Sequence, residues 1–221
     1  MSLQEAGVDM VEIGMPYSDP IADGPVIQES NMMALQKGMT MNVMFSQLEA
    51  IKERVNIPLI LMGYLNPVLQ YGIESFCVAA QRVGISGVII PDLPMYEFNS
   101  QYKQWFDKYG LKFIFLVSPV TDKKRMQQAD KLSSGFLYAV SSSSVTGQSG
   151  TTLNQAYFEN LRNTKFRNPV MIGFGIHDKE TFDVACSYAR GAIIGSAYIK
   201  ALKNSTNIAE TTKNFVRSII H

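Results

Sequence analysis

Short apolar segments alternate with helical patterns along the whole chain, and this alternation restricts the fold more than any other feature. Residues 57–64, IPLILMGY, are the clearest apolar segment. A segment this uniformly hydrophobic predicts a parallel strand that is buried on both faces. Because strands and helices follow one another in strict alternation, the pattern favours a parallel sheet with right-handed crossover connections. The chain is therefore predicted to be an α/β protein.

Seven strands are predicted, each followed by helix. The strands are expected at residues 8–13, 57–64, 87–92, 111–117, 135–140, 169–173 and 191–194. The helices are expected at 25–37, 40–55, 73–83, 96–109, 122–132, 153–163, 179–188 and beyond 194. This many units suggest a single (β/α)8 TIM barrel over residues 1–221 rather than an open sheet. Residues 4–7 look like the tail of an earlier helix, so the first strand and most of the first helix are expected to be absent from this chain.

Composition excludes several classes of protein. The 221 residues are enough for one domain with a sizeable core, and the net charge of +1 leaves no electrostatic footprint for nucleic acid or an anionic membrane. Apolar runs stop short of the roughly 18 residues that a membrane span requires, and no signal peptide is visible. Cys77 and Cys186 form no CxxC pair, which predicts neither a disulfide framework nor a metal site. A cytoplasmic location is expected.

Residues 8–28, VDMVEIGMPYSDPIADGPVIQ, combine a short apolar strand with an acidic loop. Glu12 lies on the strand and is expected to be buried or nearly so, where an ionised carboxylate costs several kcal/mol unless it is paired or its pKa rises. Asp23 follows in the loop. Two structural alternatives remain open: Glu12 could meet a buried partner and only hold the strand, and Asp23 could only cap the helix that begins at Pro25.

Further candidates lie where active sites of such barrels lie, at the carboxyl ends of the strands and in the loops that follow. These positions are Glu12, Asp23, Tyr64, Asp92, Tyr138, Gly147, Gly175 and Gly195. Gly175 and Gly195 follow the last two strands, where a helix amino end can hold a phosphate, although either glycine alone could be a tight turn. Tyr64 could equally be an ordinary aromatic residue of the rim. His177 is expected to be solvated near a helix start rather than a ligand.

Residues 141–150, SSSSVTGQSG, are too polar for a regular element of structure. They could be a linker. Their position between a strand end and the next helix instead favours a mobile lid over the active site.

The run from Glu12 to Gln28 resembles the signature of the tryptophan synthase alpha subunit family, with Tyr17 in place of the usual Phe. The resemblance extends over about residues 8–203. It includes the proposed lid only in part, because Ser142 and Ser144 replace the family's usual Arg and Gly while Thr146 and Gly147 are kept.

The resemblance implies the retro-aldol cleavage of indole-3-glycerol phosphate into indole and glyceraldehyde 3-phosphate. It implies that Glu12 is the catalytic acid and base, because burial raises its pKa, and that Asp23, on a wetter loop, stays ionised and meets the indole N–H. The implied substrate-binding residues are Tyr64, Tyr138, Thr146, Gly147, Gly175, Gly195 and Ser196. No metal or organic cofactor is expected in this subunit.

The resemblance also implies a partner, the tryptophan synthase beta subunit, which carries pyridoxal phosphate, in an alpha2-beta2 complex. Asp19, Asn66 and Pro94 are the positions expected to meet it. Two other functions stay open: a related phosphate-binding barrel that lyses or isomerises another substrate, and a noncatalytic partner subunit that lacks the first strand. Release of indole from indole-3-glycerol phosphate separates both from the main interpretation.

Overall fold

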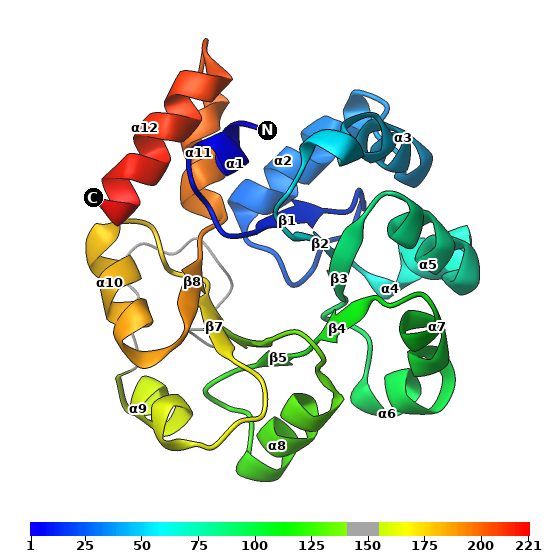
Figure 1. The fold of residues 1–221 in the computed structure, drawn as a ribbon, viewed down its shortest axis with the longest axis vertical. Helices are drawn as coiled ribbons and strands as arrows, with labels where there is room; N and C mark the ends of the chain where they lie inside the picture. Colours follow the sequence, from blue (N-terminus) through cyan, green and yellow to red (C-terminus); the bar gives the residue numbers. More distant parts are fainter. Residues whose placement is uncertain (141–154) are drawn as a thin grey trace.

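The computed structural model describes residues 1–140 and 155–221. Parallel strands form an inner layer, and the helices surround them as an outer ring (Figure 1). Among the described residues, no helix combines the length and the hydropathy needed to cross a membrane. The arrangement confirms the predicted α/β class and the barrel-like order of the units.

All seven predicted strand positions are occupied, and every pair of neighbouring strands is parallel. The strands are β1 (Val11–Gly14), β2 (Leu59–Met62), β3 (Ile85–Ile89), β4 (Lys112–Ile114), β5 (Leu116–Val117), β6 (Leu137–Val140), β7 (Val170–Gly173) and β8 (Gly191–Ile193). The first strand begins at Val11 instead of residue 8, where the Val11 N–H donates to the carbonyl of Pro58 at 3.0 Å and pairing with β2 starts.

The predicted strand at 111–117 is divided into β4 and β5 at Phe115. The Phe115 N–H donates to the hydroxyl of Ser133 at 3.1 Å, so a side chain replaces the neighbouring strand as its partner. The strands consequently form two four-stranded sheets, β1-β2-β3-β4 and β5-β6-β7-β8.

The outer helices follow the predicted order with local differences. They are α1 (Ser2–Glu5), α2 (Pro25–Gln36), α3 (Met41–Ile51), α4 (Leu65–Tyr71), α5 (Ile73–Arg82), α6 (Met95–Glu97), α7 (Lys103–Lys108), α8 (Lys123–Leu132), α9 (Gln155–Asn163), α10 (Lys179–Tyr188), α11 (Ser196–Lys203) and α12 (Ile208–Ile220). Thr40 caps α3 as predicted, since its hydroxyl accepts the N–H of Val43 at 3.2 Å. Gly38 ends the preceding helix with a φ of +83°, which favours glycine.

Three helical details differ from the prediction. Helix α3 ends at Ile51 and passes into a 3-10 turn, Lys52–Arg54, instead of continuing to residue 55. Helix α4 was not predicted, and its Pro67 lies in the first helical turn, where proline is tolerated. The helix expected at 96–109 is interrupted by a π-helical turn, Phe98–Tyr102, between α6 and α7.

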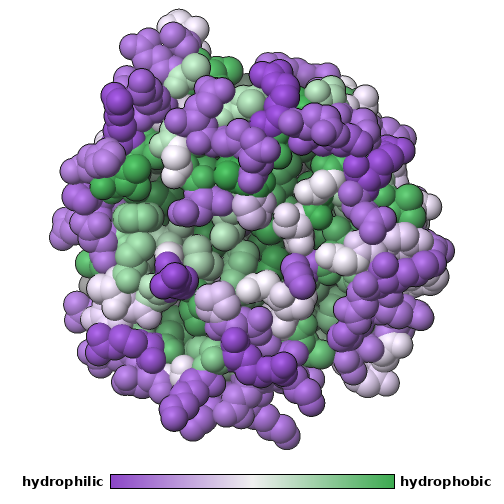
Figure 2. Space-filling view, viewed as in Figure 1, coloured by the Kyte–Doolittle hydropathy of each residue, from purple (hydrophilic) through white to green (hydrophobic). Residues whose placement is uncertain are grey.

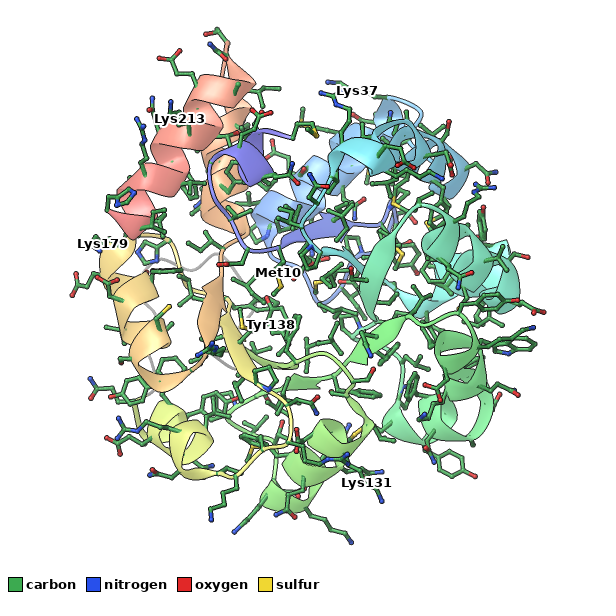
Figure 3. All side chains as sticks on the ribbon, in the orientation of Figure 1. Met10, Lys37, Lys131, Tyr138, Lys179 and Lys213 are labelled. Carbon is green, nitrogen blue, oxygen red and sulfur yellow. The ribbon has the colours of Figure 1, made fainter. Side chains whose placement is uncertain are left out.

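Two apolar clusters divide the core. A large cluster fills the space between strands and helices, and a smaller one occupies the barrel interior. The interior cluster consists of the buried residues Ile60, Ile89, Ile114, Phe136 and Tyr138, with partly buried neighbours that include Met10 and Ile193. Met10 and Tyr138 both lie towards the middle of the ring in Figure 3.

Strands β1 and β8 are not joined by a hydrogen-bonded ladder in the described part of the chain. We call the gap between them the seam. Helix α2 contacts α11 across it, and α1 lies against α12 nearby (Figure 1). The barrel is thus open at the position where sequence analysis expected a further strand. Hydrophobic residues are visible in the middle of the molecule in Figure 2, ringed by hydrophilic ones.

Candidate active site

A cavity of 1370 Å³ extends from the seam into the barrel interior. It is lined by residues of β1, β2, β6, β7 and β8 and of the helices beside the seam. Its lining includes seven of the residues predicted for the site: Glu12, Asp23, Tyr64, Tyr138, Gly175, Gly195 and Ser196. The fold therefore brings to one cavity the candidates that were drawn from five separate segments of sequence.

Glu12 lies in the middle of β1, paired in register with Ile60 of β2. Glu12 is partly buried as a residue and lines the cavity, while its carboxyl lies deep inside the protein. Burial, and secondarily the negative charge of Asp23, raises the pKa of this carboxyl from 4.5 to about 7. No cation pairs with Glu12 in the described residues. The described residues therefore supply no cationic partner for the alternative in which Glu12 only holds the strand.

Asp23 is held by Tyr64, which stands at the end of β2 and precedes α4. The Tyr64 hydroxyl donates to the Asp23 carboxylate at 2.9 Å and accepts the N–H of Ala22 at 2.9 Å. Burial raises the pKa of Asp23, so the loop shields it more than the sequence predicted, while the Tyr64 hydrogen bond opposes that rise. Tyr64 is itself buried and is thus more than a rim aromatic.

The capping interpretation of Asp23 is wrong. Pro25 is the first residue of α2, so the cap position falls on Gly24, and no side chain caps this helix end. The Asp23 carboxylate instead accepts the Tyr64 hydroxyl, and the Asp23 carbonyl accepts from the Gln28 amide at 2.9 Å.

Tyr138, on β6, is buried in the barrel interior with 3 % of its surface exposed. Burial, followed by the charges of Glu12 and Asp23, raises its pKa well above the usual value. A Cβ built on Gly173 would lie 2.2 Å from the Tyr138 hydroxyl oxygen. Gly173 is therefore the residue that leaves room for this ring.

The two glycine loops predicted to bind phosphate differ. Helix α11 begins at Ser196 with Gly195 at its cap position and no side-chain cap, so its first N–H groups are open to the cavity within the described structure. Helix α10 is already capped by the carboxylate of Asp178, which accepts the Thr181 N–H at 2.9 Å. Gly175 adopts a φ of +76° and lines the same cavity, but no free helix end follows it. His177 is exposed as predicted.

The remaining predicted residues fall into two groups. Asp19, Asn66 and Pro94 are all exposed, and they follow β1, β2 and β3 on the connections at the carboxyl ends of these strands. Thr146 and Gly147, with Ser142, Ser144 and the rest of the predicted lid at 141–150, lie outside the described residues.

The structure adds contacts that sequence reasoning missed. The ring of Tyr17 lies 5.2 Å from that of Tyr64, and Phe174 lies 5.8 Å from Tyr138. Asp92, named only as a strand-end residue, accepts the N–H of Leu65 at 2.9 Å and so fixes the start of α4 beside Tyr64. Aromatic residues next to predicted site residues were the available signal for Tyr17 and Phe174, whereas nothing in the sequence pairs Asp92 with Leu65.

The arrangement suits proton transfer within an apolar pocket. A carboxyl group with a pKa of about 7 can give and take a proton at neutral pH, and a second carboxylate is held in place by a tyrosine hydroxyl. Among the described residues, no group of three His, Cys, Asp or Glu side chains is placed to hold a metal ion, and Cys77 and Cys186 are free thiols.

Comparison with known proteins shows extensive similarity. The family model described as tryptophan synthase alpha chain matches residues 1–219. The tryptophan synthase alpha chain of Flavobacterium johnsoniae is 53 % identical over 205 residues, which are 92 % of this chain and 81 % of that protein. The solved tryptophan synthase A-subunit of Pyrococcus furiosus superposes with a TM-score of 0.88 at 30 % identity, over 99 % of this chain and 88 % of that one. A chain in the solved tryptophan synthase complex of the same organism gives a TM-score of 0.86 at 29 % identity, with the same coverage.

Proposed function

Since the chain belongs to the tryptophan synthase alpha chain family, we propose that it cleaves indole-3-glycerol phosphate into indole and glyceraldehyde 3-phosphate. Members of this family are lyases of tryptophan biosynthesis, and the specific reaction is the one that the cavity chemistry fits. The observation that carries the proposal is the Glu12 carboxyl, which has a pKa of about 7 and no ion-pair partner among the described residues.

The reaction breaks the bond between indole C3 and the adjacent carbon of the glycerol chain. A proton must reach C3, the hydroxyl on the departing carbon must lose its proton to become the aldehyde, and the indole nitrogen must be stabilised as charge develops on the ring. The number of protons is unchanged overall. A single carboxyl group that can both donate and accept a proton is therefore sufficient for the acid–base steps.

Glu12 serves as this acid and base, because its raised pKa leaves both protonation states populated at neutral pH. Asp23 accepts a hydrogen bond from the indole N–H and stabilises the charge there, and Tyr64 holds Asp23 in position. Tyr138 forms a wall of the indole pocket.

The phosphate group of the substrate binds at the amino end of α11. Gly195 and Ser196 offer N–H groups there, and the helix dipole favours an anion. Gly175 lines the same part of the cavity without a side chain to block the approach. The requirement for a phosphate at one end and two carboxylates at the other fixes the orientation of the substrate.

A beta subunit is the proposed partner, as the solved complex of the similar Pyrococcus furiosus protein suggests. Asp19, Asn66 and Pro94 are exposed on three successive connections at the carboxyl end of the barrel, where the Glu12 cavity lies. A partner that covers this end keeps indole from escaping into water. We expect turnover to rise when the beta subunit is titrated into this protein and indole formation is followed. Unchanged turnover at saturating partner, with no association in light scattering, would remove the interface assignment.

The test of the reaction is the substitution Glu12→Gln, which keeps the shape of the side chain but cannot exchange a proton. We expect kcat for indole release to fall by about 10²–10⁴, the contribution of a positioned acid or base. Glu159→Gln, on the exposed face of α9, is the matched control and should leave kcat unchanged. A Glu12→Gln protein that keeps more than about a tenth of the turnover excludes Glu12 from the mechanism. Absence of indole release from the unsubstituted protein would favour the two alternative functions.

A further inference from the structure

A second cavity, of 320 Å³, lies at the amino ends of strands β4, β6 and β7, the end of the barrel opposite to Glu12. We call it the amino-end cleft. Its walls come from α7, from the end of α8 and the turn before β6, and from the loop between α9 and β7. Lys131 marks its position at the end of α8 in Figure 3. A cavity of this size is large enough for a small organic molecule.

Cations from three separate elements line the cleft: Lys103, Lys131 and Arg167. Lys103 is paired with Asp107. In the described part of the chain, Lys131 and Arg167 form no ion pair. Lys131 can be explained as the cation that complements the carboxyl end of α8. That explanation does not extend to Arg167, which lies in a loop.

The loop that carries Arg167 is fixed in place by a buried carboxylate. Asp130, 5 % exposed, accepts the N–H of Arg167 at 2.8 Å and the N–H of Asn168 at 3.0 Å, and the Asn168 amide donates to it as well at 3.0 Å. Asp130 thus holds the backbone of this loop, and no ion pair joins its carboxylate to the Arg167 guanidinium in the described structure. The cleft thus has a preorganised wall with an unpaired cation at its edge.

Two serine hydroxyls face the cleft with unused donors. Ser133 accepts the N–H of Phe115, and Ser134 accepts the N–H of Phe113 at 3.0 Å. A hydroxyl that accepts a backbone N–H still has its own hydrogen to donate, and neither hydrogen finds an acceptor among the described residues. Ser133 is 6 % exposed, so this donor is buried at the inner wall of the cleft, where an unmet hydrogen bond costs free energy.

The floor of the cleft is apolar and rigid. Phe98, Phe106 and Phe113 line it, and their rings pack against one another with centroids 4.1 to 5.8 Å apart. Each ring is at most 2 % exposed, so the rings support the polar groups of the cleft, and these groups are complementary to an oxyanion.

We propose that the amino-end cleft binds a small organic anion, whose carboxylate or phosphate is held by Lys131, Arg167 and the hydroxyl of Ser133. Both kinds of oxyanion offer acceptors that suit an arginine fork and a hydroxyl donor. The site is separate from the Glu12 cavity, so its occupancy does not depend on the proposed reaction.

The test is a titration of the isotope-labelled protein with benzoate, followed by the backbone amide signals of Ser134, Arg167 and Asn168. Benzamide, which has the same shape without the charge, is the matched ligand control. We expect saturable shifts with benzoate and none with benzamide. Phenyl phosphate, in a parallel titration, shows whether a phosphate binds more tightly than a carboxylate at these same amides.

The matched variants are Lys131→Gln with Arg167→Gln and, as a control, Lys124→Gln with Lys165→Gln, which removes the same charge from exposed positions outside the cleft. We expect the first pair to raise the Kd for benzoate by about tenfold or more, as the loss of charge-assisted hydrogen bonds predicts, and the control pair to change it less than about twofold. Equal weakening by both pairs, equal shifts with benzamide, or shifts that do not saturate would each overturn the proposal.

Discussion

The strands of the barrel fall into two regions that differ in burial. Strands β2 to β7 form a well-covered arc in which each strand has at least one buried residue, whereas β1 and β8, at the seam, have none. The helices show the same division, because α2 and α11, which meet across the seam, contribute no buried residue, while α3, α5, α8 and α9 each contribute several.

The two regions contribute different kinds of side chain to the pocket. The two carboxyl groups, Glu12 and Asp23, come from β1 and the loop after it, on the seam side. The aromatic walls, Tyr64 and Tyr138, follow or belong to strands of the covered arc. A parallel strand that lacks a hydrogen-bonded neighbour leaves the N–H and C=O groups of one edge unpaired, and Glu12 lies on such a strand. The well-covered arc therefore supplies the shape of the pocket, and the sparsely covered strand supplies its charge.

The largest contrast is expected in stability. Leu61 on β2 has no exposed surface, whereas Ile193 on β8 is only partly buried. Leu61→Ala should lower the free energy of unfolding by about 2–5 kcal/mol, because it removes buried methyl groups and leaves a cavity. Ile193→Ala removes a side chain of similar size and should cost only about 1 kcal/mol. Urea denaturation of both variants gives the two values, and equal losses would show that the seam is as well packed as the arc.

The second expected effect is a pH dependence that originates at the seam. The folded protein holds the Glu12 proton up to about pH 7, while the unfolded chain releases it near pH 4.5. The stabilisation by this proton is fully present below pH 4.5 and is lost as pH rises to 7, so the free energy of unfolding should fall across this window by at most about 3 kcal/mol.

Urea denaturation at several pH values measures this slope. The raised pKa of Asp23 contributes in the same direction. Glu12→Gln should flatten the dependence over the same range, since glutamine does not titrate. If the pH dependence of the unfolding free energy is unchanged in this variant, it originates in other groups. That outcome would remove the argument that burial raises the pKa of Glu12.

The smallest expected effect concerns the link between the two regions, the hydrogen bond from Tyr64 to Asp23. Tyr64→Phe keeps the ring but removes the hydroxyl, and a hydrogen bond to a charged group contributes about 1.5–3 kcal/mol. We therefore expect kcat/KM for indole release to fall by roughly 10- to 150-fold. Tyr71→Phe, on the same α4 helix, is the control with an expected ratio near one. Equal kcat/KM values for the two variants would show that Asp23 is positioned without the Tyr64 hydroxyl.

Sequence reasoning predicted the order of the units because short, uniformly apolar segments such as residues 57–64 favour strands buried on both faces. It also predicted which loops converge, since all carboxyl ends of parallel strands meet at one end of a barrel. It could not predict the division at Phe115, because the Ser133 hydroxyl that takes its N–H is a tertiary contact. Helix α4 was missed for a local reason, since proline suits both a loop and a first helical turn.

The candidate site was predicted in its members but not in its contacts. Glu12 was expected to have a raised pKa because an isolated carboxylate is costly on an apolar strand, and its pKa of about 7 agrees. The partner of Asp23 was not foreseen, because Tyr64 is 41 residues away and the sequence contains nothing that pairs the two. Capping preferences predicted that Asp23 would cap the helix that follows it. In the structure the Asp23 carboxylate instead accepts a hydrogen bond from the distant Tyr64.

The close approach of Gly173 and Tyr138 has a consequence for how this sequence can change over time. Since any side chain at residue 173 would overlap the Tyr138 hydroxyl, the two positions cannot vary independently. A larger residue at 173 becomes acceptable only after residue 138 has become smaller, and that change would also reshape the pocket. The neighbouring strands β6 and β7 are in this way restricted to paired substitutions, and a survey of single substitutions would miss the double substitutions that the protein can still accept.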